Sequence, residues 1–329
     1  MTGEESSRNR MSTAPVRPIQ IPMAIGAMKT GVDRGAEVLD ETLRARLLDR
    51  NRTEISDRLR ESRVIPVASL EMPDARRYPG EALELDAVTE ASEKLANTVS
   101  TAIANGELAL TIGGDHAVSI GSIAGAAAQC EHLAVIWIDA HADMNWPEVS
   151  PSGRLHGMSL GASLGRGAPE LTHLGGTCPK VQGHDVSLVG IRLLDPGEEA
   201  WLQESQCHLL TMPDIDSVGV DAAIQHVIAR LRASGADAVH LSFDLDSLDP
   251  LVLSGTGTVE RGGFTYREAC RILRLIRQSD LPIRSIDWVE LNPDLDPTGG
   301  STDVAADLLA VALGEDVFRP KSVTGCAAR

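Results

Sequence analysis

The sequence predicts an α/β protein in which helices cover the faces of a parallel β-sheet. Apolar runs of strand length alternate with segments of helical periodicity, and clusters of Asp and His follow several of these runs. The expected strands are residues 19–25, 63–69, 108–113, 132–139, 185–191, 207–212, 238–245 and 283–291. Eight strands could also close an eightfold barrel, which is the main alternative. Both architectures place ligands at the carboxyl ends of strands.

Helical patterns separate several of these strands. Residues 84–105 carry apolar side chains at helical spacing, namely Leu85, Val88, Ala91, Leu95, Val99 and Ile103. Further helices are expected over residues 119–129, 220–233, 265–278 and 304–313. The Gly- and Pro-rich residues 165–184 are typical of a surface loop.

Chain length and composition indicate a large core. The chain has 329 residues, of which 43% are hydrophobic. No internal repeat or domain boundary is evident, so residues 19–315 are expected to form one domain. The mostly polar residues 1–18 are expected to be a disordered lead-in, and residues 316–329 a tail.

Charge and cysteine content narrow the classes of partner. A net charge of −17 disfavours nucleic acid and anionic membrane surfaces and favours a cationic substrate, although many soluble proteins are acidic without such a role. The five cysteines are scattered and none forms a Cys-x-x-Cys pair, which indicates reduced thiols in the cytoplasm. No apolar stretch approaches the roughly 18 residues of a membrane helix, and the N-terminus has no signal-peptide pattern.

The clearest functional signal is Asp139-Ala-His141-Ala-Asp143, which directly follows the apolar run 133–138. Side chains at i, i+2 and i+4 of an extended chain point to one face, so two carboxylates and an imidazole would crowd together. Such groups repel or desolvate one another unless a cation lies among them. A bound metal ion is the simplest explanation.

Two more apolar runs end in the same way, at Asp244-Leu-Asp246 and at Gly113-Gly-Asp115-His116. One such cluster could be a capped strand end or a solvated turn, but three together favour a metal centre. The candidate ligands are His116, Asp139, His141, Asp143, Asp244 and Asp246. This carboxylate-rich set is too large for one tetrahedral zinc and suits two Mn²⁺-like ions about 3.5–4 Å apart. Such a pair would lower the pKa of a bridging water towards ~7, which predicts metal-assisted hydrolysis.

These motifs resemble the ordered signatures of the ureohydrolase superfamily, which includes arginase, agmatinase and related guanidino hydrolases. The resemblance covers about residues 19–314 and rests on Gly113-Gly-Asp-His116, Asp139-Ala-His-Ala-Asp143, Ser152-Gly-Arg-Leu-His-Gly157 and Ser242-Phe-Asp-Leu-Asp-Ser-Leu-Asp-Pro250. Three segments look more like arginase than agmatinase: Gly31-Val-Asp-Arg-Gly35, Gly262-Gly-Phe-Thr-Tyr-Arg-Glu268 and Val289-Glu-Leu-Asn-Pro293.

The resemblance implies a three-layer α/β/α sandwich with an eight-stranded parallel sheet, two Mn²⁺ ions, and a homotrimer or homohexamer. One ion would be held by His116, Asp139, Asp143 and Asp244. The other would be held by Asp139, His141, Asp244 and Asp246, so that Asp139 and Asp244 bridge the pair. Asp143 would also accept a hydrogen bond from the bridging hydroxide.

Motif matching also assigns residues to the reaction and to the substrate. His156 matches a proton shuttle, which suits an imidazole of near-neutral pKa. Glu290 matches the carboxylate that receives the planar guanidinium, and Thr258 would lie near the same pocket. The alternative for His156 is an ordinary loop histidine, and the alternative for Glu290 is a strand-end charge in an ion pair. The remaining histidines are expected to be structural or surface residues.

Four more residues match positions near the α-amino acid head group. Asn145 and Ser152 match positions that bind the α-carboxylate, and Asp195 and Glu198 match positions near the α-ammonium. Asp195-Pro-Gly-Glu198 is also good chemistry for a helix N-terminus, and the two roles are compatible.

Three positions depart from the arginase pattern. Arginases usually carry Asn where this chain has Arg154, and they often carry Asp in place of Leu193 and Ser in place of Ala117. Arg154 could strengthen carboxylate binding, narrow the pocket mouth or turn outward. The expected reaction is hydrolysis of L-arginine to L-ornithine and urea. The alternatives are hydrolysis of agmatine, 4-guanidinobutyrate or 3-guanidinopropionate, and an inactive metal-binding relative. His156 and Glu290 argue against an inactive relative, and Glu290 also argues against a deacetylase or phosphoester hydrolase.

Overall fold

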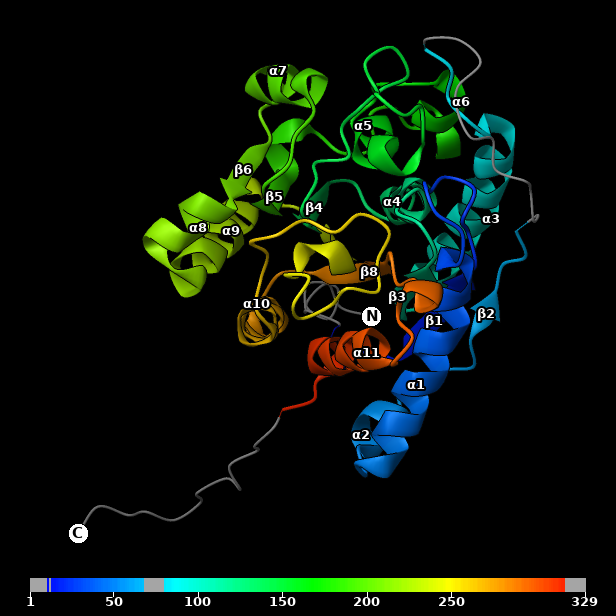
Figure 1. Cartoon of the computed structure of the whole chain (residues 1–329), viewed down its shortest axis with the longest axis vertical. Coiled ribbons are helices and arrows are strands. Elements are labelled where there is room, and N and C mark those ends of the chain that lie inside the picture. Colours follow the sequence, from blue (N-terminus) through cyan, green and yellow to red (C-terminus); the bar gives the residue numbers. More distant parts are fainter. Residues whose placement is uncertain (1–10, 12, 68–79, 317–329) are drawn as a thin grey trace.

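The computed structural model describes residues 11, 13–67 and 80–316. Its centre is a sheet of eight strands, all parallel (Figure 1). The strands are β1 (Val16–Ile21), β2 (Arg63–Val64), β3 (Leu108–Gly113), β4 (Leu133–Ile138), β5 (Val186–Ile191), β6 (His208–Thr211), β7 (Ala238–Asp244) and β8 (Ile283–Val289). Their order is β2-β1-β3-β8-β7-β4-β5-β6, so the sheet is open, with β2 and β6 at its edges. The predicted parallel α/β class is confirmed, and the eightfold barrel is excluded.

Helices cover both faces of the sheet (Figure 1). One face packs against α1 (Gly35–Asp49), α9 (Val220–Ser234), α10 (Tyr266–Gln278) and α11 (Gly300–Leu313). The other packs against α3 (Leu85–Ala104), α4 (Val118–Ala127) and α5 (Ser159–Ser163). The remaining helices are α2 (Thr53–Ser56), α6 (Pro169–Thr172), α7 (Pro196–Ser205) and α8 (Met212–Val218). The expected three-layer α/β/α sandwich is therefore present.

The strands divide their side chains between two cores. In β3, Leu108, Leu110 and Ile112 belong to the core beside α1, whereas Ala109 belongs to the core beside α3 and α4. Every residue of β3, β4 and β5 is buried. A parallel sheet covered on both faces requires such continuously apolar strands, because neither face meets water. These central strands hold the residues at their carboxyl ends in place.

The two ends of the folded part differ from the sequence prediction. β1 begins at Val16, which pairs with Leu108 and is fully buried. The prediction of a disordered lead-in over residues 1–18 is therefore wrong for residues 16–18, which belong to the sheet. Met11 is fully buried as well. Asp316, predicted to start the tail, forms an ion pair with Arg277 (Nη2–Oδ1, 2.8 Å). Residues 1–10, 12 and 317–329 lie outside the described residues.

Other boundaries also change. α11 begins at Gly300 instead of residue 304, and the predicted loop 165–184 contains α6 and short 3₁₀ turns. α1 is absent from the helices predicted above, although Leu39, Leu43 and Leu47 form its buried stripe. Within the described residues, no helix combines the length and apolar composition needed to cross a bilayer.

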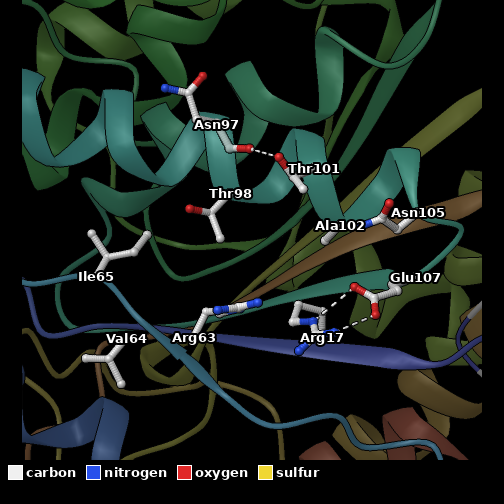
Figure 2. Close-up of a pocket in the computed structure, with 10 residues that line it drawn as sticks. All are labelled: Arg17, Arg63, Val64, Ile65, Asn97, Thr98, Thr101, Ala102, Asn105 and Glu107. Atoms are coloured by element: carbon white, nitrogen blue, oxygen red, sulfur yellow. Dashed lines mark hydrogen bonds and ion pairs between the residues drawn. The ribbon is translucent and has the colours of Figure 1, made fainter.

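A cavity of about 380 Å³ lies at the edge of the sheet, between β2 and α3 (Figure 2). It includes Arg17 and Glu107, which lie near the amino ends of β1 and β3. The Arg17 guanidinium donates to both carboxylate oxygens of Glu107, from Nε at 3.0 Å and from Nη2 at 2.7 Å. A third donor, Nη1, reaches the Glu61 carbonyl at 2.9 Å. The Glu107 carboxylate in this cavity is therefore matched by a cation of the chain itself.

Candidate active site

A larger cavity, of about 710 Å³, lies where the carboxyl ends of four adjacent strands meet. β3 leads to His116, β8 to Glu290, β7 ends at Asp244, and β4 leads to Asp139. The predicted residues that line the cavity are His141, Asp143, Asn145, Ser152, Arg154, His156, Asp195, Glu198, Asp244, Asp246, Thr258 and Glu290. His116 and Asp139 are fully buried next to these residues. The structure thus brings the whole predicted set to one place.

The first group of possible metal ligands surrounds the imidazole of His116. Its Nδ1 atom lies 3.1 Å from Asp139 Oδ2, 3.1 Å from Asp143 Oδ2 and 2.9 Å from Asp244 Oδ2. Nδ1 makes no hydrogen bond within the described residues, although it is buried. The other ring nitrogen, Nε2, is within 2.8 Å of Ser242 Oγ. A buried nitrogen that faces three carboxylate oxygens without a hydrogen bond is well placed to bind a cation.

The second group is built around His141. Its Nδ1 atom lies 3.4 Å from Asp139 Oδ1 and 3.1 Å from Asp246 Oδ2. Ligand atoms from these three residues all lie within 4.8 Å of one another. Asp139 belongs to both groups and presents a different oxygen to each histidine, as a bridging carboxylate would.

Asp244 belongs only to the first group, although the sequence predicts that it bridges. Its second oxygen, Oδ1, accepts the backbone N–H of Asp246 at 2.7 Å. Oxygen and nitrogen ligands dominated by carboxylate suit Mn²⁺-like ions, so the donor set fits the metal expected from the sequence.

Burial and mutual repulsion shift the pKa values of these carboxyl groups. Burial, followed by the charges of neighbouring aspartates, raises the pKa of Asp244 well above its usual value and that of Asp246 to about 6. The pKa of Asp143 is raised for the same reasons. Burial opposes the shift of Asp139, but its contacts with His116 and His141 lower its pKa overall. A cluster of this kind is stabilised by cations placed among the carboxylates.

Two site residues occupy left-handed backbone conformations that residues other than glycine rarely adopt. Asp143 has φ 49° and Glu290 has φ 67°. Such conformations cost about 1–3 kcal/mol and persist where the surrounding structure fixes them. Gly161 N–H donates to the Asp143 carbonyl at 3.0 Å, and Glu290 N–H donates to the Gly114 carbonyl at 2.9 Å. Both carboxylates are therefore aimed by their backbones.

His156 and Glu290 face each other in the cavity. His156 Nδ1 lies 3.5 Å from Glu290 Oε1, and that oxygen also accepts the backbone N–H of His116 at 2.9 Å. Burial opposes protonation of His156, but Glu290 and then Asp143 raise its pKa above the usual value. The anchored carboxylate of Glu290 therefore favours the protonated form of His156.

Two of the residues predicted to bind the substrate head group, Asp195 and Glu198, lie at the start of α7, and Asn145 contacts Asp195. Asn145 Nδ2 donates to Asp195 Oδ2 at 2.8 Å. Glu198 accepts the N–H groups of Met144 and Asp195, both at 2.9 Å, and burial raises its pKa to about 7. Asp195 is the N-cap of α7 in a capping box with Glu198, so the predicted helix start is confirmed.

The remaining predicted residues are Thr258 and Ser152, and three positions differ from the arginase pattern. Thr258 Oγ1 donates to Asp246 Oδ2 at 2.9 Å, and Ser152 Oγ accepts the N–H of Arg154 at 3.2 Å. Arg154 is buried and lines the cavity, so it does not turn outward. Leu193 is 45% exposed, and Ala117 is fully buried.

Two supporting residues were missed from the sequence. Trp137 Nε1 donates to Asp139 Oδ2 at 2.9 Å, and its ring stacks on His116 with centroids 4.1 Å apart. Ser242 bonds the Nε2 atom of His116. Each lies two residues before a predicted ligand, Asp139 or Asp244, and the period-two alternation of a strand could have identified both.

Comparisons with known proteins agree with this geometry. The model of the Arginase family matches residues 16–314. An arginase from Bacillus caldovelox is 39% identical over 308 residues, covering 92% of this chain and 99% of that protein. Crystal structures of arginases from Bacillus caldovelox and Bacillus subtilis superpose with TM-scores of 0.84 and 0.83, at 38% and 36% identity, each over 93% of this chain and 100% of theirs. The chain belongs to the arginase family.

Proposed function

We propose that this protein hydrolyses L-arginine to L-ornithine and urea with two Mn²⁺ ions. The observation that carries the proposal is a single cavity with two different ends: Glu290 and His156 beside the carboxylate cluster, and Asn145 and Asp195 at the start of α7. A hydrolase of guanidino C–N bonds is what membership of the family indicates. The substrate and the ion are the proposed parts.

Under this proposal the six ligands divide as the sequence resemblance implies. His116, Asp139, Asp143 and Asp244 would hold one ion, and Asp139, His141 and Asp246 the other, to which the resemblance adds Asp244. When bound, two such ions lower the pKa of a water molecule towards ~7 and supply the nucleophile for hydrolysis. Asp143 would accept a hydrogen bond from that nucleophile, and its fixed backbone conformation supports this role.

Glu290 and His156 would act on the guanidinium end of the substrate. A carboxylate accepts a planar guanidinium in a two-pronged hydrogen bond, and the His116 N–H fixes one Glu290 oxygen at 2.9 Å. His156, whose pKa is raised by Glu290, would hold a proton at Nδ1 and donate it to the nitrogen of the leaving amine.

The opposite end of the cavity would bind the amino acid head group. Asn145, Ser152 and Arg154 offer hydrogen-bond donors to a carboxylate. Asp195 offers a carboxylate to an ammonium group, and Glu198 lies beside it in the same cavity. Both charges of the head group therefore have partners of opposite sign. This supports L-arginine over a substrate whose head group carries a single charge.

A guanidino acid without the α-amino group is the second candidate. Arg154 places a cation in the cavity near Ser152, which would favour a carboxylate whether or not an ammonium group is present. Agmatine, which lacks the carboxylate, gains nothing from Arg154. An inactive relative would have no use for the paired His156 and Glu290.

The test is urea release in the presence of Mn²⁺ from L-arginine, agmatine, 4-guanidinobutyrate and 3-guanidinopropionate. The proposal expects the highest kcat/KM with L-arginine. Higher kcat/KM with 4-guanidinobutyrate would replace the substrate and leave the chemistry standing. No urea from any of the four would remove the enzymatic proposal.

We also propose a cytoplasmic homotrimer or homohexamer. The four described cysteines, Cys130, Cys178, Cys207 and Cys270, are free thiols, as expected in a reducing compartment. The oligomer follows from the family resemblance alone. Light scattering after gel filtration would test it, and a monomer at micromolar concentration would contradict it.

A further inference from the structure

The guanidinium of Arg166 lies close to the rings of Trp146 and Trp201, next to the cavity. Its guanidinium carbon lies 3.4 Å from the centroid of Trp146 and 4.8 Å from that of Trp201. The two rings meet edge to face, with centroids 5.9 Å apart and planes at 84°. Among the described residues, no carboxylate forms an ion pair with Arg166, although the chain has 47 acidic residues. The choice of aromatic partners indicates a specific cation–π contact.

The two tryptophans belong to the two segments that form the head-group end of the cavity. Trp146 directly follows Asn145, and its carbonyl accepts the N–H groups of Val149 at 3.0 Å and Ser150 at 2.9 Å. This turn leads into Ser150, Pro151 and Ser152, which line the cavity. Trp201 lies on α7, whose N-cap is Asp195. Arg166 therefore contacts both segments at once.

The same two segments also touch at other points. A Cβ atom added to Gly197 on α7 would lie 2.7 Å from Val149 Cγ2, so the helix and the 146–150 turn are in close contact there. Asn145 and Asp195 share a hydrogen bond. Arg166 itself is fixed just after α5, where its N–H donates to the Gly161 carbonyl at 2.9 Å. The guanidinium thus adds a third link between the segments from a third element.

We propose that Arg166 is a positioning residue that clamps residues 144–152 to α7 and so sets the spacing of Asn145, Ser152 and Asp195 for the substrate head group. The inference rests on the proposed function, because it names the device that shapes the head-group end. Arg166 is not among the residues that line the cavity. Its loss should therefore weaken head-group binding while the carboxylate cluster, His156 and Glu290 remain in place.

The experiment compares Arg166→Gln, Arg166→Lys and, as a control, Arg232→Gln, which removes an exposed ion pair with Asp280. In Arg166→Gln, KM for L-arginine and the inhibition constant of L-ornithine should both rise about tenfold, while kcat stays within about twofold. Arg166→Lys keeps the charge but loses the planar guanidinium. Its KM and its inhibition constant should therefore lie between those of the wild type and those of Arg166→Gln. The control should match the wild type.

Hydrogen exchange provides a readout that does not depend on turnover. In Arg166→Gln, amides of residues 144–152 and of α7 should exchange faster, while those of α9 stay unchanged. Unchanged exchange in both segments, or a fall in kcat with constant KM and L-ornithine inhibition, would overturn the clamp. Absence of urea release by the wild type would refute the proposed function alone, because hydrogen exchange would still decide whether the clamp exists.

Discussion

The two cavities at opposite ends of the sheet balance buried carboxylates in different ways. Near the amino ends of β1 and β3, the Glu107 carboxylate accepts hydrogen bonds from Nε and Nη2 of Arg17. At the carboxyl ends, Asp139, Asp143, Asp244 and Asp246 lie together, and among the described residues no lysine or arginine forms an ion pair with any of them. The first region is balanced by a cation of the chain itself, whereas the second gathers four carboxylates around two histidines and would be completed by bound cations.

The largest expected effect is at the carboxyl-end cluster. Asp246→Asn removes one charge of the second ligand group with little change in shape, so the protein should lose one of its two ions and more than 100-fold in kcat. Elemental analysis and urea release measure the two effects. The matched control is Asp280→Asn on the surface. Retention of both ions would show that the ligand assignment is wrong.

The free energy of unfolding should depend on pH through Glu198, at the end of the cavity next to α7. Burial raises the pKa of Glu198 from 4.5 to about 7, so the folded state retains a proton that the unfolded state releases. This stabilisation is complete below about pH 4.5 and is lost as the pH rises through about 7. Between pH 5 and pH 8, the wild type should lose about 2 kcal/mol of unfolding free energy relative to Glu198→Gln.

Denaturant unfolding at the two pH values measures this difference. Glu199→Gln is the matched control, because Glu199 is exposed on the same helix. A constant difference between wild type and Glu198→Gln across this range would show that Glu198 is not held protonated by its surroundings.

A smaller effect is expected on substrate choice. Asp195→Asn keeps an N-cap acceptor for α7 but removes the charge proposed to meet the α-ammonium. The kcat/KM for L-arginine should fall about tenfold relative to that for 4-guanidinobutyrate, as expected when one charged contact is lost. An equal loss on both substrates would remove Asp195 as the residue that recognises the ammonium group.

The smallest effect belongs to the amino-end cavity. Arg17→Met removes the two-pronged partner of Glu107, whose side chain is 11% exposed, and should cost about 1–2 kcal/mol of stability. Urea release should stay unchanged, because this ion pair lies near the amino ends of β1 and β3 and its cavity shares no lining residue with the carboxyl-end cavity. A loss of activity in the folded variant would contradict the expectation that the Arg17–Glu107 pair has no effect on the carboxyl-end site.

Most of the site could be predicted because strand geometry is local. An extended chain predicts that Asp139, His141 and Asp143 gather on one side, and they do gather, although β4 ends at Ile138 and Asp143 has a left-handed backbone. The carboxyl ends of parallel strands bring Asp244 and Asp246 to them. The capping box at Asp195 was also readable from sequence.

The misses arose from tertiary contacts. Val16 joins the sheet only because it pairs with Leu108, although the charged and Pro-containing segment around it resembles a polar lead-in. The Trp146–Arg166–Trp201 stack joins three elements that are separated along the chain, and no local pattern marks it. The bridging role expected of Asp244 stays a prediction, because it depends on side-chain orientation, which a motif does not specify.

The central claim is that the carboxyl-end cluster is completed by two divalent cations. The most direct measurement is a calorimetric titration of Mn²⁺ into chelator-treated protein, with Asp139→Asn alongside because Asp139 belongs to both ligand groups. We expect two ions for each wild-type chain and a loss of tight binding at both sites in the variant. Fewer than two ions in the wild type, or two tightly bound ions in Asp139→Asn, would contradict it.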